Sequence, residues 1–247
     1  MHAPIVSRLI RLYVGLILYG LSMAMMIRAR LGLDPWDVFH QGVTRHLPLS
    51  FGTVTILTGA AVMLLWIPLR QRPGLGTVSN VFVIGLAVDR FLALLPAPDA
   101  YAARVPLLLG GVVLNGLAGG LYIGARLGAG PRDGLMTGYA ARTGGSLRLV
   151  RTAIEVSVLV VGFLLGGSPG PGTVVYALAI GPLTQWFLRH VSYPAASAGR
   201  PEPEAPQMRS SRLAVARWMR ASVWPGRSSA GDQAKVPAAN TSAPPGA

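Results

Sequence analysis

The sequence predicts an all-α integral membrane protein made of two three-helix inverted repeats, six transmembrane helices in all, with a short interfacial or re-entrant helix in each repeat. Hydrophobic residues make up 51% of the 247 residues and charged residues only 13%, a composition typical of membrane proteins. Several apolar runs are long enough to cross a bilayer core at about 1.5 Å per residue. A set of motifs that occurs twice divides these runs into two equal groups.

The duplication is visible as short strings that recur 96 positions apart. ARLGLDPWD at residues 29–37 matches ARLGAGPRD at 125–133, and PGLGTV at 73–78 matches PGPGTV at 169–174. When residues 8–95 are aligned without a gap to residues 104–191, more than a quarter of the positions are identical. We therefore predict transmembrane repeat 1 at 8–95 and transmembrane repeat 2 at 104–191.

Each repeat contains three predicted spans and one short helix. The spans lie at about 9–27, 51–69, 78–95, 105–124, 149–165 and 173–191. The short helices begin at Pro35 and Pro131, because proline favours the first helical position, and Asp34 is a suitable cap for the first. They are too short and too polar to span alone, so they lie at the interface or enter as re-entrant segments. If they did cross, each repeat would have four spans and the repeats would be parallel.

Three is an odd number of spans, so the second repeat enters the membrane from the opposite side. Of the 15 arginines up to residue 192, ten fall on the cytoplasmic side if the N-terminus is inside and five on the other. Positive residues concentrate on the cytoplasmic side of membrane proteins. We therefore expect the N-terminus and the C-terminus to be cytoplasmic.

The composition changes abruptly at residue 193. Eight of the 20 prolines lie in residues 193–247, together with seven Lys or Arg against three Asp or Glu. Such a segment is typical of disorder. We predict a disordered basic cytoplasmic tail at 193–247.

Composition and motif spacing disfavour several other classes of protein. The absence of cysteine excludes disulfides, thiol nucleophiles and Cys-ligated zinc, and a basic balance beside long apolar runs favours a membrane surface over nucleic acid. His40 follows Asp37 by three positions, but the second repeat has Met136 at the matching position and no zinc or nucleophile motif is present. A solvated interfacial helix would account for His40 and His46. We expect no enzymatic activity, no catalytic residue, no metal and no cofactor.

The best candidates for a substrate or ion path are Asp37 and Asp133, which occupy matching positions in the first turn of the two short helices. Broken segments at matching places in inverted halves form the central site of many secondary transporters, and two carboxylates suit a cation or a proton. The simpler alternative is that each carboxylate only stabilises the positive end of its helix.

Three further polar residues lie within predicted spans. Asp89 and Gln185 occupy equivalent positions in the third span of each repeat, where a charge is costly unless it is paired or lines a cavity. Asp89 at the far interface is the alternative. Glu155 follows Arg151 by four residues, a spacing that favours a local ion pair.

Glycine and proline account for the remaining matched positions. Gly116 and Gly120 fall four residues apart in the fourth span, a spacing that lets helices approach closely. The matched loop and turn residues are Gly32, Gly128, Pro35, Pro131, Gly76 and Gly172.

The strings ARLGLDPWDVFHQG, PGLGT, ARLGAGPRDGLMTG, RTAIE and PGPGTVVYALAIGP resemble the YczE/YyaS/YitT group of bacterial multi-pass membrane proteins over residues 8–191. The resemblance implies a polytopic helical fold in the bacterial plasma (inner) membrane and supplies no substrate.

Two functions follow as expectations. The first is a secondary transporter or permease-like protein for an unidentified small solute, favoured by the duplication and the polar breaks. The second is a non-transporting membrane scaffold or regulatory partner protein. The expected partners are the lipid bilayer and the solute, while a homodimer through the glycine faces and a protein partner for the tail stay open.

Overall fold

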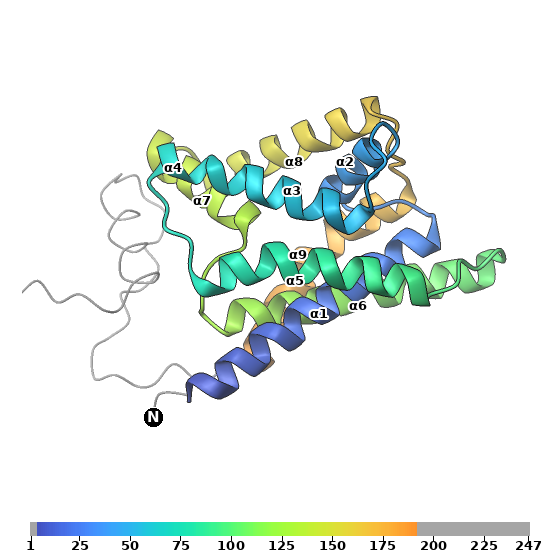
Figure 1. Cartoon of the computed structure of the whole chain (residues 1–247), viewed down its shortest axis with the longest axis horizontal. Helices are drawn as coiled ribbons and strands as arrows, with labels where there is room; N and C mark the ends of the chain where they lie inside the picture. Colours follow the sequence, from blue (N-terminus) through green and yellow to red (C-terminus); the bar gives the residue numbers. More distant parts are fainter. Residues whose placement is uncertain (1–3, 192–247) are drawn as a thin grey trace, which may run out of the picture. The chain divides into compact units, whose positions relative to one another are not determined.

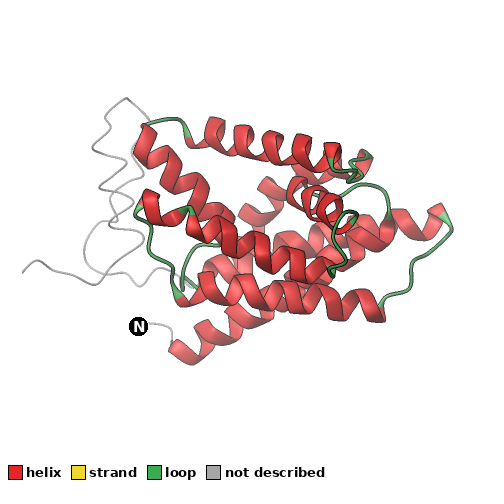
Figure 2. Ribbon diagram, turned by 45° about the horizontal axis from the view of Figure 1, so that its top comes forward, coloured by secondary structure: helices red, strands yellow, loops and turns green. Residues whose placement is uncertain are grey.

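The computed structural model describes residues 4–191, and every element of regular structure in that range is helical (Figures 1 and 2). The predicted tail at 193–247 lies outside the described residues. The helices are α1 (Ile5–Ala29), α2 (Pro35–Thr44), α3 (Phe51–Leu64), α4 (Trp66–Leu69), α5 (Leu75–Leu94), α6 (Tyr101–Gly124), α7 (Pro131–Thr143), α8 (Leu147–Leu164) and α9 (Pro171–Val191). All eight helical segments expected from the sequence are helical.

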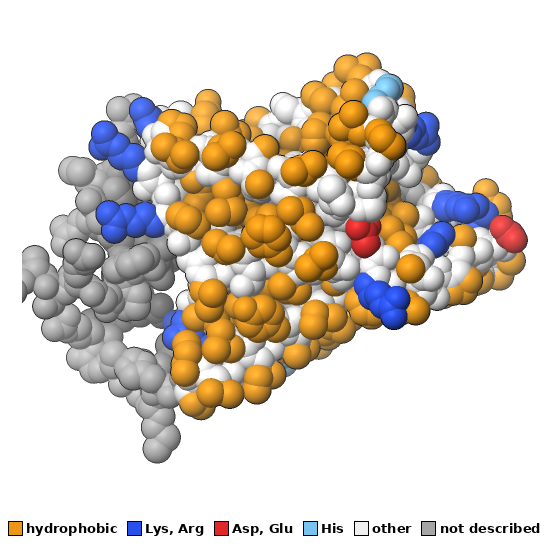
Figure 3. All heavy atoms as spheres, in the orientation of Figure 1, with side chains coloured by type: hydrophobic (Ala, Val, Ile, Leu, Met, Phe, Trp, Pro, Cys, Tyr) orange, Lys and Arg blue, Asp and Glu red, His pale blue; other side chains and the backbone are white. Residues whose placement is uncertain are grey.

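Within residues 4–191, four segments are long and apolar enough to cross a membrane: α1, Phe51–Leu69, α5 and α6. Large hydrophobic side chains on these helices are exposed, and Figure 3 shows them over the middle of the visible face with arginines towards both ends. Because so much exposed apolar surface is stable only in lipid, the chain is a multi-helix membrane protein. The predicted spans at α8 and α9 are helical but are not among the four; α8 carries Arg148, Arg151 and Glu155.

The expected continuous helix at 51–69 is interrupted at Leu65, between α3 and α4. Pro68 explains the interruption, because it has no N–H to donate and its ring would clash with the carbonyl four residues earlier, at Leu64. Beyond the break, the indole N–H of Trp66 donates to the carbonyl of Pro131, at 3.0 Å. The break therefore lets this segment contact the start of α7.

Helices α1 and α6 pack side by side and antiparallel. The Arg8 side chain at the start of α1 donates to the carbonyl of Ala125, just beyond the end of α6, at 2.9 Å, and the Asn115 amide donates to Ser22 Oγ at 2.8 Å. In contrast, α5 runs parallel to α1, and α9 runs parallel to α6: Gly20 lies against α5 at Val88, and Gly116 against α9 at Leu183. Each of α1 and α6 thus carries one parallel neighbour.

The matched glycines do the packing and turning that the sequence predicted. A Cβ on Gly116 would lie 2.7 Å from the Leu183 Cβ, and one on Gly120 would lie 3.0 Å from the Phe187 Cβ, so both positions require glycine for close helix contact. Gly32 and Gly128 have φ angles of 118° and 134°, which side chains rarely adopt.

The loops that follow α1 and α6 make one reciprocal pair of hydrogen bonds. The Gly76 N–H at the start of α5 donates to the Leu127 carbonyl, and the Gly172 N–H at the start of α9 donates to the Leu31 carbonyl, each at 2.8 Å. Each loop is thereby fixed by the other half of the chain. The short helices α2 and α7 follow directly from these fixed loops.

Candidate functional site

The short helices α2 and α7 both begin in the interior of the protein and run outward to different ends. Pro35 and Pro131, their first residues, are buried. Helix α2 packs along α8, where Gly162 contacts Phe39, and α7 packs along α4, with Gly138 beside Gln71. Their N-termini face each other, because Arg132 at the start of α7 lies within 4.0 Å of Asp37 in α2.

The burial of α2 corrects one expectation. A solvated interfacial helix does not describe α2, since the side chain of His40 is 0% exposed. Only His46, beyond the end of α2, is exposed, and its Nε2 lies 3.1 Å from the Leu165 carbonyl oxygen. Helix α2 is thus enclosed by other parts of the protein, and whether it is interfacial or re-entrant stays a prediction.

The acidic side of the site lies at the start of α2. Asp34 caps the helix by accepting the Asp37 N–H at 2.9 Å. His40 Nδ1 lies 3.2 Å from Asp37 Oδ1 and 3.3 Å from Thr55 Oγ1 of α3. The Oδ2 atoms of both Asp34 and Asp37 are buried and have no hydrogen-bond partner among the described residues. A buried carboxylate oxygen without a donor is costly, so this side of the site is suited to a proton or a cation.

The basic side is one residue, Arg132, at the second position of α7. Its guanidinium lies 3.9 Å from Asp34 Oδ1 and 4.0 Å from Asp37 Oδ1. It also lies 4.9 Å from the centre of the Trp36 ring, within the range of a cation–π interaction. The Arg132 side chain is 25% exposed whereas Asp37 is 0% exposed, so the cation lies between the buried carboxylates and a more open space.

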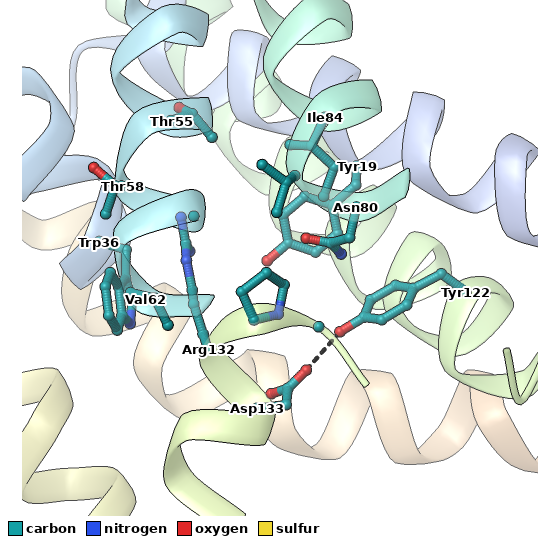
Figure 4. A pocket seen from close by; sticks show the side chains of 14 residues that line it. Tyr19, Trp36, Thr55, Thr58, Val62, Asn80, Ile84, Tyr122, Arg132 and Asp133 are labelled. Atoms are coloured by element: carbon teal, nitrogen blue, oxygen red, sulfur yellow. Dashed lines mark hydrogen bonds between the residues drawn. The ribbon is translucent and has the colours of Figure 1, made fainter. Parts of the chain in front are cut away.

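That space is a cavity of about 90 Å³. Because a water molecule takes up roughly 30 Å³ in the liquid, it has room for a few waters or a very small solute. In Figure 4, Trp36 and Arg132 lie together on one side and Tyr19, Asn80 and Tyr122 on the other, and the Tyr122 hydroxyl donates to Asp133 Oδ2 at 2.7 Å. The lining residues are Tyr19, Trp36, Thr55, Thr58, Gly59, Val62, Asn80, Val81, Ile84, Tyr122, Gly130, Pro131, Arg132 and Asp133.

Burial sets the electrostatics of the acidic side, which lies outside the four candidate spans. Loss of water and, to a smaller extent, the neighbouring Asp37 charge raise the pKa of Asp34 to about 6, against the opposing effect of Arg132. The pKa of Asp37 is likewise raised to about 6 by burial, against the effect of Arg132. Burial lowers the pKa of His40 well below its ordinary value, so the imidazole is neutral.

The predicted site residues separate into two groups. Asp37 lies in the buried cluster within 4.0 Å of Arg132, and Asp133 lines the cavity that Arg132 also lines. Asp89 instead accepts the Gly52 N–H at 2.7 Å and the Ser50 hydroxyl, both at the start of α3.

The other two predicted residues also lie away from the cavity. Gln185 is exposed on α9, and Glu155 pairs with Arg151 at 3.0 Å, as the four-residue spacing predicted. Asp89, Gln185 and Glu155 are therefore not among the residues that line the cavity.

Sequence reasoning missed the central role of Arg132 and gave Asp34 only a capping role. The two matched motifs could have pointed to both residues, because each stands at a position where the motifs differ. Asp34 aligns with Gly130, and Arg132 aligns with Trp36. Tyr19 and Tyr122 carried no signal, because an aromatic residue within an apolar run is ordinary.

Comparison with known proteins gives relatives whose function is also unassigned. The model of a family described as "Family of unknown function (DUF6198)" matches residues 6–189. An uncharacterized protein of Haemophilus influenzae is 40% identical over 178 residues, which cover 72% of this chain and 82% of that protein. The uncharacterized membrane protein YczE of Bacillus subtilis is 33% identical over 190 residues, covering 76% and 88%.

A more distant relative is the uncharacterized protein YyaS of Bacillus subtilis, 22% identical over 179 residues, which cover 71% of this chain and 89% of that protein. YczE and YyaS confirm the resemblance inferred from the motifs. No solved structure gives a significant match.

Proposed function

Since the chain belongs to the DUF6198 family of unknown function, we propose from its geometry that it is a secondary transporter or permease-like protein for a small solute, coupled to a proton or another cation. The observation that carries this proposal is the meeting of two short helices, from opposite ends of the molecule, at buried charges beside a cavity. In secondary transporters, broken helices at matching places in two halves build the substrate and ion sites.

The proposal includes two inverted repeats of three spans, at 8–95 and 104–191. Supporting it, the Gly76–Leu127 and Gly172–Leu31 hydrogen bonds exchange places when each residue is shifted by the repeat length. The antiparallel packing of α1 and α6, each with a parallel neighbour, also fits an inverted pair. An internal two-fold relation of this kind lets one half move against the other around a fixed centre.

The proposal also places the N-terminus in the cytoplasm of a bacterial cell. Arg8 contacts Arg126, and Arg142 of α7 contacts Pro68 beside Arg70, so these arginines lie at one end of the helices. The positive-inside rule assigns the arginine-rich end to the cytoplasm.

The chemistry of the site lies in its charges. It combines two buried carboxylates, one arginine and a histidine beside a small cavity. Such a cluster binds and releases ions or polar groups by exchanging charge partners. We therefore propose translocation rather than catalysis.

The test is transport in liposomes that contain the purified full chain and an entrapped pH indicator. A panel of labelled small amino acids, carboxylates and amines is added outside, and both the uptake of each solute and the accompanying proton movement are recorded. We expect at least about a tenfold loss for Asp37→Asn and Asp133→Asn, whereas Gln185→Ala, exposed on α9, retains the wild-type rate. The proposal would be contradicted if no solute of the panel were taken up, or if both aspartate variants took up solute at the wild-type rate.

A non-transporting scaffold or regulatory partner is the second candidate, and the basic composition of residues 193–247 is the observation in its favour. Deleting residues 193–247 separates the two functions. A scaffold loses its cellular phenotype with the tail, while a transporter retains flux in liposomes.

A further inference from the structure

We propose that Asp34 and Asp37 form a proton-binding site, and that Arg132 is a tethered cation that occupies this site when the proton has left. The inference deepens the proposed function by naming the coupling ion, and it rests on that function only for the use of the proton in transport. Proton binding itself is a property of the purified protein.

The first support is the pattern of unsatisfied atoms. Asp34 is 2% exposed and Asp37 is 0% exposed, and one oxygen of each, Oδ2, has no hydrogen-bond donor. One proton taken from water converts one carboxylate into a carboxylic acid, which then has an O–H to donate. Protonation therefore removes one buried negative charge and supplies a donor where two acceptors lack one.

The second support is the loose position of Arg132. Its distances of 3.9 and 4.0 Å to the two carboxylates exceed the roughly 2.7–2.9 Å of a direct charge-assisted hydrogen bond. The guanidinium is held between both carboxylates without being locked to either, and the same side chain lines the cavity. When a proton neutralises the pair, the attraction on Arg132 falls and the side chain becomes available to the cavity.

The other titratable groups near Asp34 and Asp37 do not supply the positive charge that a bound proton brings. His40 on α2 lies 3.2 Å from Asp37 Oδ1 but is fully buried and neutral. Asp34 and Asp37 act electrostatically on Tyr19 of α1 and Tyr176 of α9, whose phenols are neutral where carboxyls titrate, and Asp133 is already bonded to Tyr122. Arg132 is thus the one cation within 4.0 Å of the carboxylates in residues 4–191.

Infrared difference spectroscopy on the purified full chain in lipid, without any solute, tests the site. Carboxyl protonation is followed as pH is changed, through the C=O stretching band that only protonated carboxyls show. Wild-type protein should show a band component that titrates at higher pH than exposed carboxyls do, because the pKa values of Asp34 and Asp37 are raised to about 6. This component should be lost in the Asp34→Asn/Asp37→Asn double variant and kept in Asp133→Asn. Arg132→Gln should raise the midpoint by about 1–3 pH units, since an adjacent cation favours the ionised carboxylate.

Two controls separate a specific effect from damage or from another ion. Arg132→Lys retains the positive charge and should keep the midpoint nearer to wild type than Arg132→Gln does. Replacing potassium with sodium in the buffer should leave the wild-type midpoint unchanged, whereas a lower midpoint in sodium would identify a sodium site and overturn the proposal. Survival of the high-pH component in the double variant, or a midpoint of that component that Arg132→Gln does not raise, would also overturn it.

The outcome is independent of the transport assay. If the high-pH component titrates as expected while liposomes show no solute-dependent flux, the proton site stands and the transport function fails. If flux is present but that component is absent from the wild type, transport stands and the coupling ion is not a proton at this pair.

Discussion

Helices α2 and α7 occupy equivalent positions in the two halves of the sequence, yet they bring opposite charges to the same place. Both start with a buried proline after a loop that contains a glycine of positive φ. At the next position α2 has Trp36, and α7 has Arg132, whose guanidinium lies over that tryptophan ring. Equivalent backbone thus places an aromatic face against a cation, which two identical copies could not do.

Asp37 and Asp133 also differ in burial and in their hydrogen-bond partners, although they are equivalent in sequence. Asp37 is fully buried beside Asp34, His40 and Arg132, whereas Asp133, its equivalent, lines the cavity and accepts the Tyr122 hydroxyl. The first half therefore supplies a buried acidic cluster. The second half supplies the cation, Arg132, and part of the cavity wall. Under the proposed transport function, the buried cluster would hold the ion and the cavity would hold the solute.

The largest expected effect concerns the packing that holds α7 in place. Trp66 is 3% exposed, contacts Gly134 and donates to Pro131, so Trp66→Ala should lower the free energy of unfolding by about 3–5 kcal/mol. The loss in free energy of unfolding is measured by circular dichroism as the protein unfolds in mixed micelles. The matched control is Trp186→Ala, because Trp186 is 55% exposed; equal losses in both variants would contradict the packing described for α7.

A smaller effect distinguishes the equivalent residues Asp89 and Gln185. Asp89 caps the start of α3, and loss of a cap costs about 0.5–2 kcal/mol. Asp89→Ala should reduce stability by that amount, while Gln185→Ala should not, because Gln185 is exposed. The same micelle assay reads both variants, and a larger loss for Gln185→Ala would reverse this assignment.

The smallest effect belongs to the ion pair between Arg151 and Glu155, which has no counterpart in the first half. Both side chains are partly exposed, at 51% and 31%, and such pairs contribute about 0.3–0.5 kcal/mol. Glu155→Gln should change stability by no more than this and leave proton movement in liposomes at the wild-type rate. Loss of that movement would place Glu155 on the path after all.

The sequence predicted the helices better than the site. Apolar runs and the prolines at 35 and 131 located each helical segment to within a few residues, because helix length and start signals are local. Pro68 was the missed local signal: it ends α3 at Leu64. Asp37 and Asp133 were selected because the matched motifs marked them, and their place on a path stays a prediction.

Arg132 was missed for a physical reason. Its importance comes from contact with Asp34, which is distant in sequence, and no periodicity or motif encodes that contact. The duplication drew attention to residues that match, whereas the charge that completes the site stands where the two copies differ.

The central claim is that α2 and α7 extend from a shared interior to opposite sides of the membrane. The chain has no native cysteine, so single cysteines at the exposed positions Leu47, beyond the end of α2, and Ala141, near the end of α7, can be labelled cleanly. A membrane-impermeant thiol reagent added to intact cells should label Leu47→Cys and leave Ala141→Cys unlabelled until the membrane is opened. Labelling of both positions from the same side would contradict the claim.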